Sequence, residues 1–414
     1  MANKPRIRFR GFTEDWEQRK FLDLLDTQNG IRRGPFGSSL KKDSFVKKSD
    51  YVVYEQQNAI YDNYVTRYFI SKEKYNELIR FNIQPGDFIM SGAGTIGRIS
   101  MVPDGIKKGV FNQALIRFKV DKNSVNPLYF LKFMQSDMMQ KQLTQANPGS
   151  AMTNLVPMDE LKKWDVTIPS LEEQNKISNF INQIDESITL HQCKLKKLNL
   201  AKKSLLQKLF PRNGSQIPGV RFKGFTDAWE QRKLGDIATF SKGNGYSKSD
   251  LAPSGDPIIL YGRLYTNYET TIRNVDTFVE LKDKSVISQG DEVIVPASGE
   301  TVEDISRASV VKDQGVIIGG DLNVIKVNHL LDPTFLALTI SNGEQQKELS
   351  KRAQGKSVVH LHNSDLQEVN LTFPLLNEQK EISTLFEKMD SIITLHQQEP
   401  FLCGNSVNGG VELC

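Results

Sequence analysis

Two nearly identical stretches, 213 positions apart, constrain the architecture of this chain more than any other feature. Residues 8–20 are RFRGFTEDWEQRK and residues 221–233 are RFKGFTDAWEQRK. A second pair, PSLEEQNKISNFINQIDESITLHQ at 169–192 and PLLNEQKEISTLFEKMDSIITLHQ at 374–397, repeats after 205 positions. Solenoid repeats have periods of about 20–50 residues, so this period is far too long for one. The sequence therefore predicts two copies of one domain-sized module.

Weaker matches occur in the same order between these two anchors. QPGDFIM at 84–90 corresponds to SQGDEVIV at 288–295, and NPLYFLKF at 126–133 corresponds to DPTFLALT at 332–339. Each module thus opens with a nearly constant motif, continues through a divergent middle of about 150 residues, and closes with a similar segment. We expect the two modules to be related by an approximate two-fold axis.

The closing segment of the first module predicts one long coiled-coil helix. Steps of four and three from Ile177 give a seam in which eight of ten positions are apolar, which is typical of helices that pack as a coiled coil. Ser170 followed by Glu173 predicts the start of the helix, and Pro211 predicts its end. The ten seam positions are Ile177, Ile181, Ile184, Ile188, His191, Leu195, Leu198, Lys202, Leu205 and Leu209. At ~1.5 Å per residue, we expect a rod of nearly 60 Å that holds two bodies apart.

The closing segment of the second module repeats this seam only in part. Its seam positions are Ile382, Phe386, Met389, Ile393 and His396. The next seam position is Pro400, which removes a helical hydrogen bond, and three glycines follow it. We expect the second helix to end near Gln398. In an antiparallel pair it would face Leu195–Leu209 and leave the earlier half of the first seam without a partner helix. His191 and His396 are equivalent positions, and we expect them to fix the register of the pair.

The divergent middles predict a mixed fold. Short β-rich runs such as YVVYEQQ, FIMSGAG, ALIRFKV, PIILYGRLY and EVIVPAS are separated by Gly, Asp and Asn turns, and one amphipathic helix follows each Asn-Pro or Asp-Pro pair. The fold class is α/β (α+β), with two domains in tandem duplicate joined by long coiled-coil helices with pseudo-two-fold symmetry. The expected segments are domain 1 (1–170), central helix (171–212), domain 2 (213–374), shortened C-terminal helix (375–398) and divergent tail (399–414).

Composition excludes several classes of protein. Charged residues make up 25% and hydrophobic residues 38% of the 414 residues, which is typical of globular proteins rather than disordered ones. No apolar run approaches the ~20 residues of a membrane span, and the N-terminus carries no hydrophobic signal core. The three cysteines, Cys193, Cys403 and Cys414, are too scattered for a disulfide framework or a zinc site. We therefore expect a cytoplasmic protein.

The net charge of +4 is distributed unevenly along the chain. Residues 1–170 carry +8 and residues 171–212 carry +4, whereas 213–373 and 374–414 each carry −4. A basic first half permits a polyanionic partner, but the acidic second half does not indicate one. Charge alone does not decide the function.

Motifs for catalysis and cofactors are imperfect or missing. SGAGTIG at 91–97 has the glycine spacing of a dinucleotide fingerprint, but a predicted strand follows it instead of the required helix, so a tight hairpin turn is the better interpretation. NPLY at 126–129 and DPTF at 332–335 lack the middle proline of amino-methyltransferase loops, and both are better interpreted as helix N-caps. No Walker A motif occurs. We expect no cofactor, no bound metal and no catalytic site.

The duplicated plan resembles the DNA-specificity subunit of Type I restriction–modification enzymes over residues 1 to about 398. The motifs that carry the resemblance are GFTEDWEQRKF and GFTDAWEQRKL, GPFGSSLKKDSF, LEEQNKISNFINQID and LNEQKEISTLFEKMD. Individually these motifs are modest, but their order, twice over, is specific. The resemblance implies that each divergent block is a target-recognition domain for one half of a bipartite site in double-stranded DNA. It also implies that the helices set the spacing and recruit two modification (methyltransferase) subunits, that restriction subunits join through that complex, and that the subunit itself catalyses nothing.

Sequence recognition requires polar and basic side chains on loops held by a rigid scaffold. The candidate loops of the first block are 31–42, 55–58, 91–98, 111–113 and 149–154, and those of the second block are 241–250, 261–268, 297–300 and 355–362. The candidate DNA-binding residues are Arg32, Arg33, Lys41, Lys42, Gln56, Arg98, Asn154, Lys242, Tyr246, Lys248, Arg263, Tyr265, Lys356 and His360. The candidate helix-packing residues are Ile177, Ile181, Ile184, Ile188, Leu195, Leu198, Leu205, Leu209, Ile382, Phe386, Met389 and Ile393. Phosphate contacts, which position a protein without specifying sequence, would dominate the first list.

The shortened second helix departs from the family pattern and keeps two alternatives open. One is an assembly-defective or decoy protein that binds modification subunits without delivering them to DNA. The other is an enzyme fused to DNA-recognition modules, against which the missing motifs argue. A neighbouring reading frame for an adenine methyltransferase would favour the specificity subunit.

Overall fold

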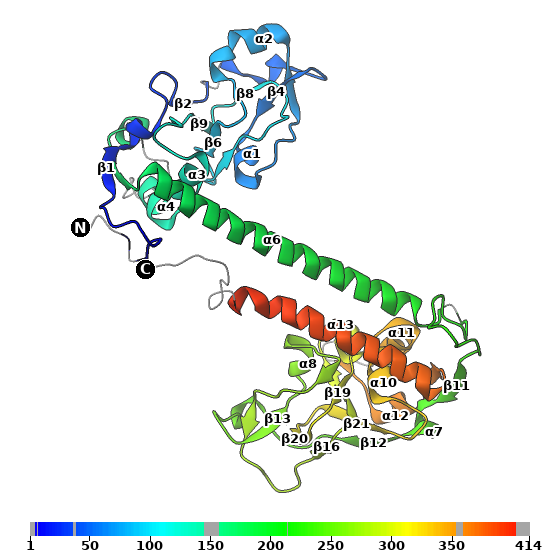
Figure 1. Ribbon diagram of the computed structural model, residues 1–414. Helices are drawn as coiled ribbons and strands as arrows, with labels where there is room; N and C mark the ends of the chain where they lie inside the picture. Colours follow the sequence, from blue (N-terminus) through cyan, green and yellow to red (C-terminus); the bar gives the residue numbers. More distant parts are fainter. Residues whose placement is uncertain are drawn as a thin grey trace. The chain divides into compact units, whose positions relative to one another are not determined.

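The computed structural model describes residues 5, 7–35, 39–144, 157–212, 214–352 and 359–402 (Figure 1). The chain forms two compact units, unit 1 up to Thr189 and unit 2 from Leu190, and the division falls inside one long helix. Each unit has its own sheets and its own buried apolar clusters. Among the described helices, none combines the length and the apolar character that a membrane crossing requires.

Unit 1 is built on two four-stranded sheets. One has the strand order β2-β9-β6-β7 and is antiparallel, whereas the other, β3-β5-β4-β8, contains the parallel pair β4–β8. The strands are β1 (Glu17–Lys20), β2 (Ile31–Arg33), β3 (Phe45–Val46), β4 (Tyr51–Tyr54), β5 (Tyr68–Ile70), β6 (Phe88–Ser91), β7 (Ile99–Met101), β8 (Gly109–Phe111), β9 (Leu115–Phe118) and β10 (Asp165–Ile168). The helices are α1 (Gln56–Tyr61), α2 (Lys72–Glu77), α3 (Pro127–Gln135), α4 (Asp137–Thr144), α5 (Met158–Leu161) and α6 (Leu171–Lys208).

Unit 2 repeats this plan with additional strands. Its sheets have the orders β12-β21-β17-β19-β14 and β15-β13-β20-β16, and β13 and β20 are parallel like β4 and β8. The strands are β11 (Glu230–Lys233), β12 (Ala238–Lys242), β13 (Asp256–Ile259), β14 (Thr271–Ile272), β15 (Phe278–Val279), β16 (Ile287–Gln289), β17 (Glu292–Pro296), β18 (Ser298–Gly299), β19 (Ser309–Val311), β20 (Gln314–Ile318), β21 (Leu322–Val327), β22 (Val359–His360) and β23 (Asn370–Phe373). The helices are α7 (Leu234–Ile237), α8 (Arg263–Thr266), α9 (Val302–Ile305), α10 (Pro333–Ile340), α11 (Gly343–Arg352), α12 (Asn363–Gln367) and α13 (Leu376–Leu402).

Strands β6 and β17 explain why the sequence repeats QPGDFIM as SQGDEVIV. In β6, Phe88 and Met90 enter one apolar cluster while Ile89 enters the other, because successive side chains of a strand point to opposite faces. In β17, Val293 and Ile294 divide between two clusters in the same way. Each strand is buried on both faces, which accounts for its uninterrupted apolar run.

The two predicted N-caps are confirmed. The side chain of Asn126 accepts a hydrogen bond from the amide of Tyr129 (2.9 Å), and that of Asp332 accepts one from the amide of Phe335 (2.9 Å), so α3 and α10 both begin with proline at their first position. The prediction of one amphipathic helix per block was incomplete. A second helix, α4 or α11, follows each of them, and α10 is buried on all sides rather than on one face.

The repeated opening and closing motifs are the two sides of one contact. In unit 1, both Nε and Nη2 of Arg8 donate to the carboxylate of Glu173 at 2.9 and 2.7 Å, and in unit 2 the guanidinium of Arg221 donates to Glu378 at 2.9 and 2.6 Å. Both carboxylate side chains are only 2% exposed. Ser170 caps α6 as predicted, because its hydroxyl accepts from the amide of Glu173, but the Glu173 side chain is bound by arginine and does not complete a capping box.

The glutamine that follows each of these glutamates completes the contact, which we call the module lock. Gln174 accepts from the amide of Asn126 at 3.0 Å, and Gln379 accepts from the amide of Asp332 at 2.8 Å. Each glutamine also donates to two backbone carbonyl oxygens. The repeated EQRK segments, 17–20 and 230–233, form strands β1 and β11, which pair with β10 and β23 just before the closing helices. These segments and the repeated Glu-Gln pairs, 173–174 and 378–379, are constant because they join the beginning of each module to its end.

Helix α6 spans Leu171–Lys208, so it begins directly after Ser170 as expected and ends three residues before Pro211. Helix α13 continues to Leu402, so the prediction that it ends near Gln398 was wrong by one turn. A proline removes one backbone hydrogen bond and raises the cost of a helix, but the helix still continues two residues past Pro400. The repeat would place the end of a full-length helix at position 413, so α13 is nonetheless the shorter of the two.

Within unit 2, α13 packs antiparallel to the second half of α6. The rings of His191 and His396 lie 5.7 Å apart, and Lys202 pairs with Asp390, so residue numbers rise along one helix as they fall along the other. Ile382 and Phe386 are buried in the cluster that also contains Leu209. Among the other candidate packing residues of this half, Ile393 is buried, and Leu195, Leu198, Leu205 and Met389 are half-buried.

The first half of the α6 seam is more open. Ile184 and Ile188 are 42% and 43% exposed, whereas Ile181 is half-buried and Ile177 packs against an apolar cluster of unit 1. This gradient agrees with the expectation that the shortened α13 leaves the earlier seam positions without a partner helix.

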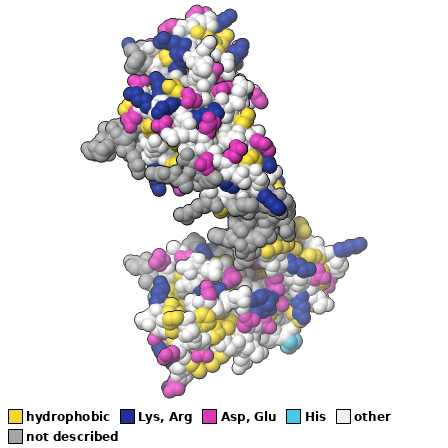
Figure 2. All heavy atoms as spheres, turned by 60° about the vertical axis from the view of Figure 1, so that its left-hand side comes forward, with side chains coloured by type: hydrophobic (Ala, Val, Ile, Leu, Met, Phe, Trp, Pro, Cys, Tyr) yellow, Lys and Arg dark blue, Asp and Glu magenta, His cyan; other side chains and the backbone are white. Residues whose placement is uncertain are grey.

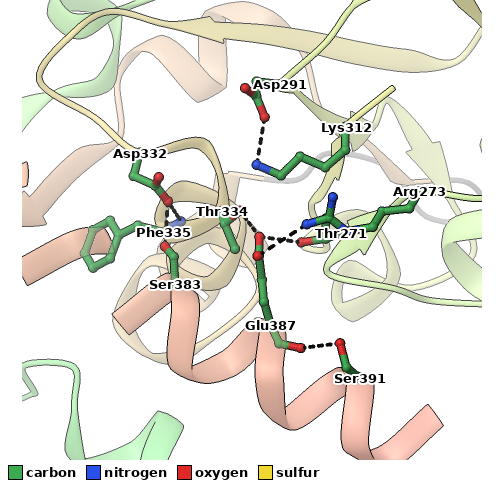
Figure 3. Close-up of polar contacts among 10 residues, drawn as sticks. All are labelled: Thr271, Arg273, Asp291, Lys312, Asp332, Thr334, Phe335, Ser383, Glu387 and Ser391. Atoms are coloured by element: carbon green, nitrogen blue, oxygen red, sulfur yellow. Dashed lines mark hydrogen bonds and ion pairs between the residues drawn. The ribbon is translucent and has the colours of Figure 1, made fainter. Parts of the chain in front are cut away.

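Polar contacts fix α13 to the body of unit 2 (Figure 3). Glu387 accepts from the hydroxyl of Thr334 at 3.0 Å and lies 3.4 Å from a guanidinium nitrogen of Arg273. One turn earlier, the hydroxyl of Ser383 donates to Asp332, the N-cap of α10. In unit 1 the position equivalent to Glu387 is Asn182, which donates to Glu186 of its own helix. The closing helices of the two units are therefore attached through different side chains at this position.

Candidate nucleic-acid interface

In unit 1, four of the predicted recognition loops meet at one edge of the two sheets. The loops follow β2, β4, β6 and β8, and three backbone hydrogen bonds join them to one another. The bonds run from the amides of Gly34, Gly92 and Asn112 to the carbonyl oxygens of Leu115 (2.9 Å), Ala114 (2.7 Å) and Tyr54 (2.9 Å), respectively. Loops that lie far apart in the sequence thus form a single surface, which we call the loop edge.

Unit 2 has the same loop edge, held by equivalent bonds. These run from the amides of Gly243, Ala297 and Gly319 to the carbonyl oxygens of Leu322 (2.9 Å), Asp321 (2.8 Å) and Ile259 (3.0 Å), respectively. A further bond from the amide of Leu361 to Ala297 (3.0 Å) adds the loop around β22 to this surface. All four predicted loops of the second block therefore contribute to one edge.

One glycine at each edge is required by close backbone contact. A Cβ atom on Gly34 would lie 1.8 Å from the carbonyl oxygen of Asn112, and one on Gly243 would lie 1.9 Å from that of Gly319. Both distances are far below the closest approach of real Cβ atoms, so no other residue fits without moving the backbone. The two modules therefore share the fine construction of the edge as well as its strand order.

The glycine-rich segment of unit 1 forms the predicted hairpin turn between β6 and β7. Gly94 and Gly97 have φ angles of +65° and +78°, and the amide of Gly97 donates to the carbonyl oxygen of Ser91. Strand β7 follows directly, so the turn lacks the helix on which a dinucleotide site depends. A Cβ atom on Gly94 would lie 3.7 Å from Nε2 of Gln56, which places that side chain beside the turn.

The cationic candidates of unit 1 are mostly free to meet a ligand. Arg33, Lys41, Lys42 and Arg98 are exposed, and none of them forms an ion pair within the described part of the chain. Arg32 is half-buried and donates to Asn29 at 3.3 Å. Asn154 lies outside the described residues.

Arg117, which the sequence analysis did not single out, supports this edge from inside. It lies opposite Arg32 on the neighbouring strand, is only 2% exposed, and donates to the carbonyl oxygens of Asn82 and Asn29. Burial lowers its pKa, the carboxylate of Asp87 opposes that effect, and the charge of Arg32 adds to the lowering. The β-rich run ALIRFKV predicted the strand that carries Arg117, but no sequence signal indicated that this side chain is buried or that its partners are backbone carbonyls.

Three candidates of unit 2 are occupied by contacts within the unit. Arg263 pairs with Glu269 and Asp276 at 2.9 and 2.7 Å and its side chain is 11% exposed. Tyr265 donates its hydroxyl to the carbonyl oxygen of Ser298, and burial raises its pKa. These side chains hold the α8 loop in place.

Tyr246 is likewise engaged. Its hydroxyl accepts from the amide of Lys282 at 2.7 Å and lies 2.6 Å from the hydroxyl of Ser285. Its backbone is in the left-handed region, with a φ of +61°. By contrast, Lys242, Lys248 and His360 are exposed, and Lys356 lies outside the described residues.

The loop at Gly319–Asp321 also belongs to the edge of unit 2 and was missed. Its equivalent in the first block, FNQ at 111–113, was among the candidates. Aligning the two blocks would have found it, because the two loops occupy equivalent places in the fold. One joins β8 to β9, the other joins β20 to β21, and β8 and β20 are each part of a parallel pair. Asp321 is exposed and has a φ of +58°.

Two modules with one scaffold, differing at the loop edge and each closed by a helix, define a duplicated recognition protein. A family model for the Type I restriction modification DNA specificity domain matches residues 13–200 and 226–401, one segment in each module. The chain belongs to this family, and the resemblance predicted from the repeated motifs is confirmed.

Individual relatives agree with the family assignment. The putative type I restriction enzyme MjaX specificity subunit of Methanocaldococcus jannaschii is 23% identical over 406 residues, covering 93% of this chain and 89% of the relative. The MjaVIII specificity subunit of the same organism is 20% identical over 304 residues, covering 71% and 70% of the two chains. The crystal structure of a Type-I restriction-modification system S subunit from M. genitalium is similar with a TM-score of 0.56 at 14% identity, over 93% of this chain and 92% of that one, which shows a shared fold.

Proposed function

We propose that this chain is the non-catalytic DNA-recognition subunit of a Type I restriction–modification enzyme, and that each unit recognises one half of a bipartite site in duplex DNA. The observation that carries the proposal is the pair of loop edges, which share three equivalent backbone hydrogen bonds but differ in sequence. A constant scaffold that presents variable polar loops is the arrangement by which one fold recognises different base sequences.

At the edge of unit 1, Arg98 is the best candidate for a base contact. It is exposed on a rigid hairpin turn beside Gln56, and arginine contacts guanine in the major groove through two hydrogen bonds. Lys41 and Lys42 suit phosphate contacts, which position the protein without recognising sequence. At the edge of unit 2, His360, Lys242 and Lys248 take these roles. Asn154 and Lys356 remain predictions.

The helices have two proposed roles. The coiled-coil pair sets the spacing between half-sites, because half-site spacing follows from the geometry of the protein. It also provides docking places for two modification subunits, and restriction subunits join through that complex. The exposed Ile184 and Ile188 support a docking role for the first half of α6, since apolar seam residues are usually covered in a coiled coil.

The test is to express the chain with an adenine methyltransferase of the same restriction system and map methylated bases across the host genome. We expect methylation at one motif split into two half-sites by a spacer of fixed length. The variant Arg98→Gln should relax or abolish one half-site and leave the other unchanged. A matched change, Lys163→Gln, alters an exposed cation near β10, away from the loop edge, and should leave the motif intact.

Other outcomes identify the alternatives. A soluble complex with the methyltransferase that methylates no motif would indicate the decoy protein, and restoring a full-length second helix should then recover methylation. Methylation by this chain expressed alone would contradict the non-catalytic assignment. A single undivided motif would contradict the assignment of one half-site to each unit.

A further inference from the structure

The second half of α6 and the segment after it contain no acidic residue. Between Glu186 and Asp227 there are 40 residues with nine Lys and Arg and no Asp or Glu, although 49 acidic residues in 414 would give about five in a segment of that length. Six of the nine are lysines of α6. All six lie in unit 2, whose domain is otherwise acidic.

Only two of these nine cations have an ion-pair partner in the described part of the chain: Lys202 pairs with Asp390 and Arg221 with Glu378. The others are exposed. They are Lys194, Lys196, Lys197, Lys203, Lys208, Arg212 and Lys223. Figure 2 shows that elsewhere on the face it draws, Lys and Arg are interspersed with Asp and Glu. A segment of this length with nine cations and no acidic residue is therefore a local feature of the sequence.

Helix stability does not explain the pattern. Cations favour the C-terminal end of a helix, but the effect is confined to about the last turn, which contains only Lys208. Lys194 and Lys197 are neighbours on the helix surface, and like charges at that spacing are destabilising.

Three of the lysines share one face of α6. At 3.6 residues per turn, Lys194, Lys197 and Lys208 lie within about 60° of one another around the helix axis and span about 21 Å along it. Ala201 lies between them on this face, and Ser204 and Leu205 flank it on either side. Lys196 and Lys203 lie on a different face, more than about 100° from Lys208.

The Lys194, Lys197 and Lys208 face lies to one side of the surface by which α6 packs on the body of unit 2, and all three lysines are exposed. Asn199 and Leu206 lie on the opposite side of α6, where they line cavities together with Tyr268 of that body. Leu206 also packs against the main apolar cluster of the unit. The lysine face is thus open to a ligand that approaches from outside.

We propose that the face formed by Lys194, Lys197 and Lys208 binds the phosphate backbone of duplex DNA without recognising bases. The inference rests on the proposed function, and it adds a sequence-independent contact outside the two loop edges. Lysine ammonium groups act as point charges that suit phosphates, and duplex DNA presents one negative charge per ~1.7 Å of axis. The exposed lysines, in a segment that carries no acidic residue, supply the positive charge that such a polyanion attracts.

The test measures how the affinity of two full-length variants for duplex DNA depends on salt concentration. One duplex contains the mapped split motif, and the other is the same duplex with both half-sites scrambled. The first variant is Lys194→Gln/Lys197→Gln/Lys208→Gln, and the matched control is Lys196→Gln/Lys203→Gln on the other face. Each lost phosphate contact lowers the slope of log K against log salt by about 0.9, so the first variant should lose about 2–3 units of slope. The control should lose less than about 1 unit.

The affinity of the first variant should fall by the same factor on both duplexes, because a backbone contact carries no sequence information. Lys→Arg at the same three positions should restore the slope. Glutamine and arginine retain helix propensity, so circular dichroism should be unchanged. An unchanged slope, or an equal loss in the control, would overturn the proposal. Loss of copurification with modification subunits at an unchanged slope would overturn it in favour of an acidic protein partner.

The proposed function fails separately from this inference. If genome-wide mapping shows no split motif, the recognition role is wrong whatever the lysines do. If the split motif is present and the slope does not respond to the first variant, only the lysine face is wrong.

Discussion

The loop edges of the two units share three equivalent backbone hydrogen bonds but differ in how some of their side chains are used. In unit 1 the exposed candidates Arg33, Lys41, Lys42 and Arg98 have no ion-pair partner in the described chain. In unit 2, Arg263 is held by two carboxylates. The comparison teaches that duplication preserved the backbone contacts that build the edge, whereas the polar side chains on it were free to become either ligand contacts or structural contacts.

The module lock is the feature that the two units share most closely, and removing it should have the largest effect. Glu173→Ala and Glu378→Ala each leave an arginine buried without its carboxylate, which costs roughly 3–5 kcal/mol for a buried pair. We expect a loss of similar size in both variants, confined to the unit that carries the change. Hydrogen exchange of the β10 amides reports on unit 1, and exchange of the β23 amides reports on unit 2.

Exposed residues next to Glu173 and Glu378 supply control variants for the module lock. Glu172→Ala and Asn377→Ala change the adjacent, solvent-facing position in each unit and should leave exchange unchanged. If Glu173→Ala and Glu378→Ala differed by more than about 2 kcal/mol, the equivalence of the two modules would be contradicted at the contact that defines it.

The glycines at the two edges should give the next largest effect. Gly34→Ala and Gly243→Ala place a Cβ atom against a backbone carbonyl, and overpacking of this kind costs roughly 1–3 kcal/mol. Both variants should be less stable to urea and should lose methylation at their own half-site. Gly262→Ala is the control, because no atom lies within 4 Å of a Cβ built there and its φ is not positive. Normal recognition by Gly34→Ala would show that the edge of unit 1 does not contact DNA.

A pair of arginines separates the two uses of side chains directly. Arg98→Gln should weaken binding to the motif by about 10-fold or more, consistent with the ~1–3 kcal/mol of a specific base contact, and should leave thermal unfolding unchanged. Arg263→Gln should lower the unfolding temperature of unit 2, because it breaks two ion pairs of a side chain that is 11% exposed. Both are measured by DNA binding and by thermal scans. The reverse pattern would show that the two edges have exchanged roles.

Much of this architecture was predictable because the repeat supplied two independent versions of each element. The N-caps at Asn126 and Asp332, the hairpin turn at Gly94 and the seam of α6 each follow from local rules that the structure obeys. The end of α13 was misplaced because the cost of a proline near a helix end is small enough for one more turn to form.

The use of individual side chains was not predictable, because it depends on partners that are distant in the sequence. Tyr246 is 39 positions from Ser285, and Arg8 is 165 positions from Glu173. A loop residue that recognises a base and one that binds a carboxylate across the loop have the same composition and the same neighbours in sequence. Only the folded chain distinguishes Arg98 from Arg263.

The smallest effect concerns two aspartates at the same position of the repeat. Asp185 pairs with Lys132 of α3 in unit 1, whereas Asp390 pairs with Lys202 of α6 in unit 2. The repeat partner of Lys202 is Val407, so the sequence offers no second lysine of this kind to Asp185. A double-mutant cycle with Lys202→Met and Asp390→Asn should give a coupling of about 0.5–1 kcal/mol, because both side chains are partly exposed. The cycle with Lys132→Met and Asp185→Asn should give a similar value, measured by urea unfolding. Zero coupling in the first cycle, with normal coupling in the second, would mean that the Lys202–Asp390 ion pair does not help to hold α13 against α6.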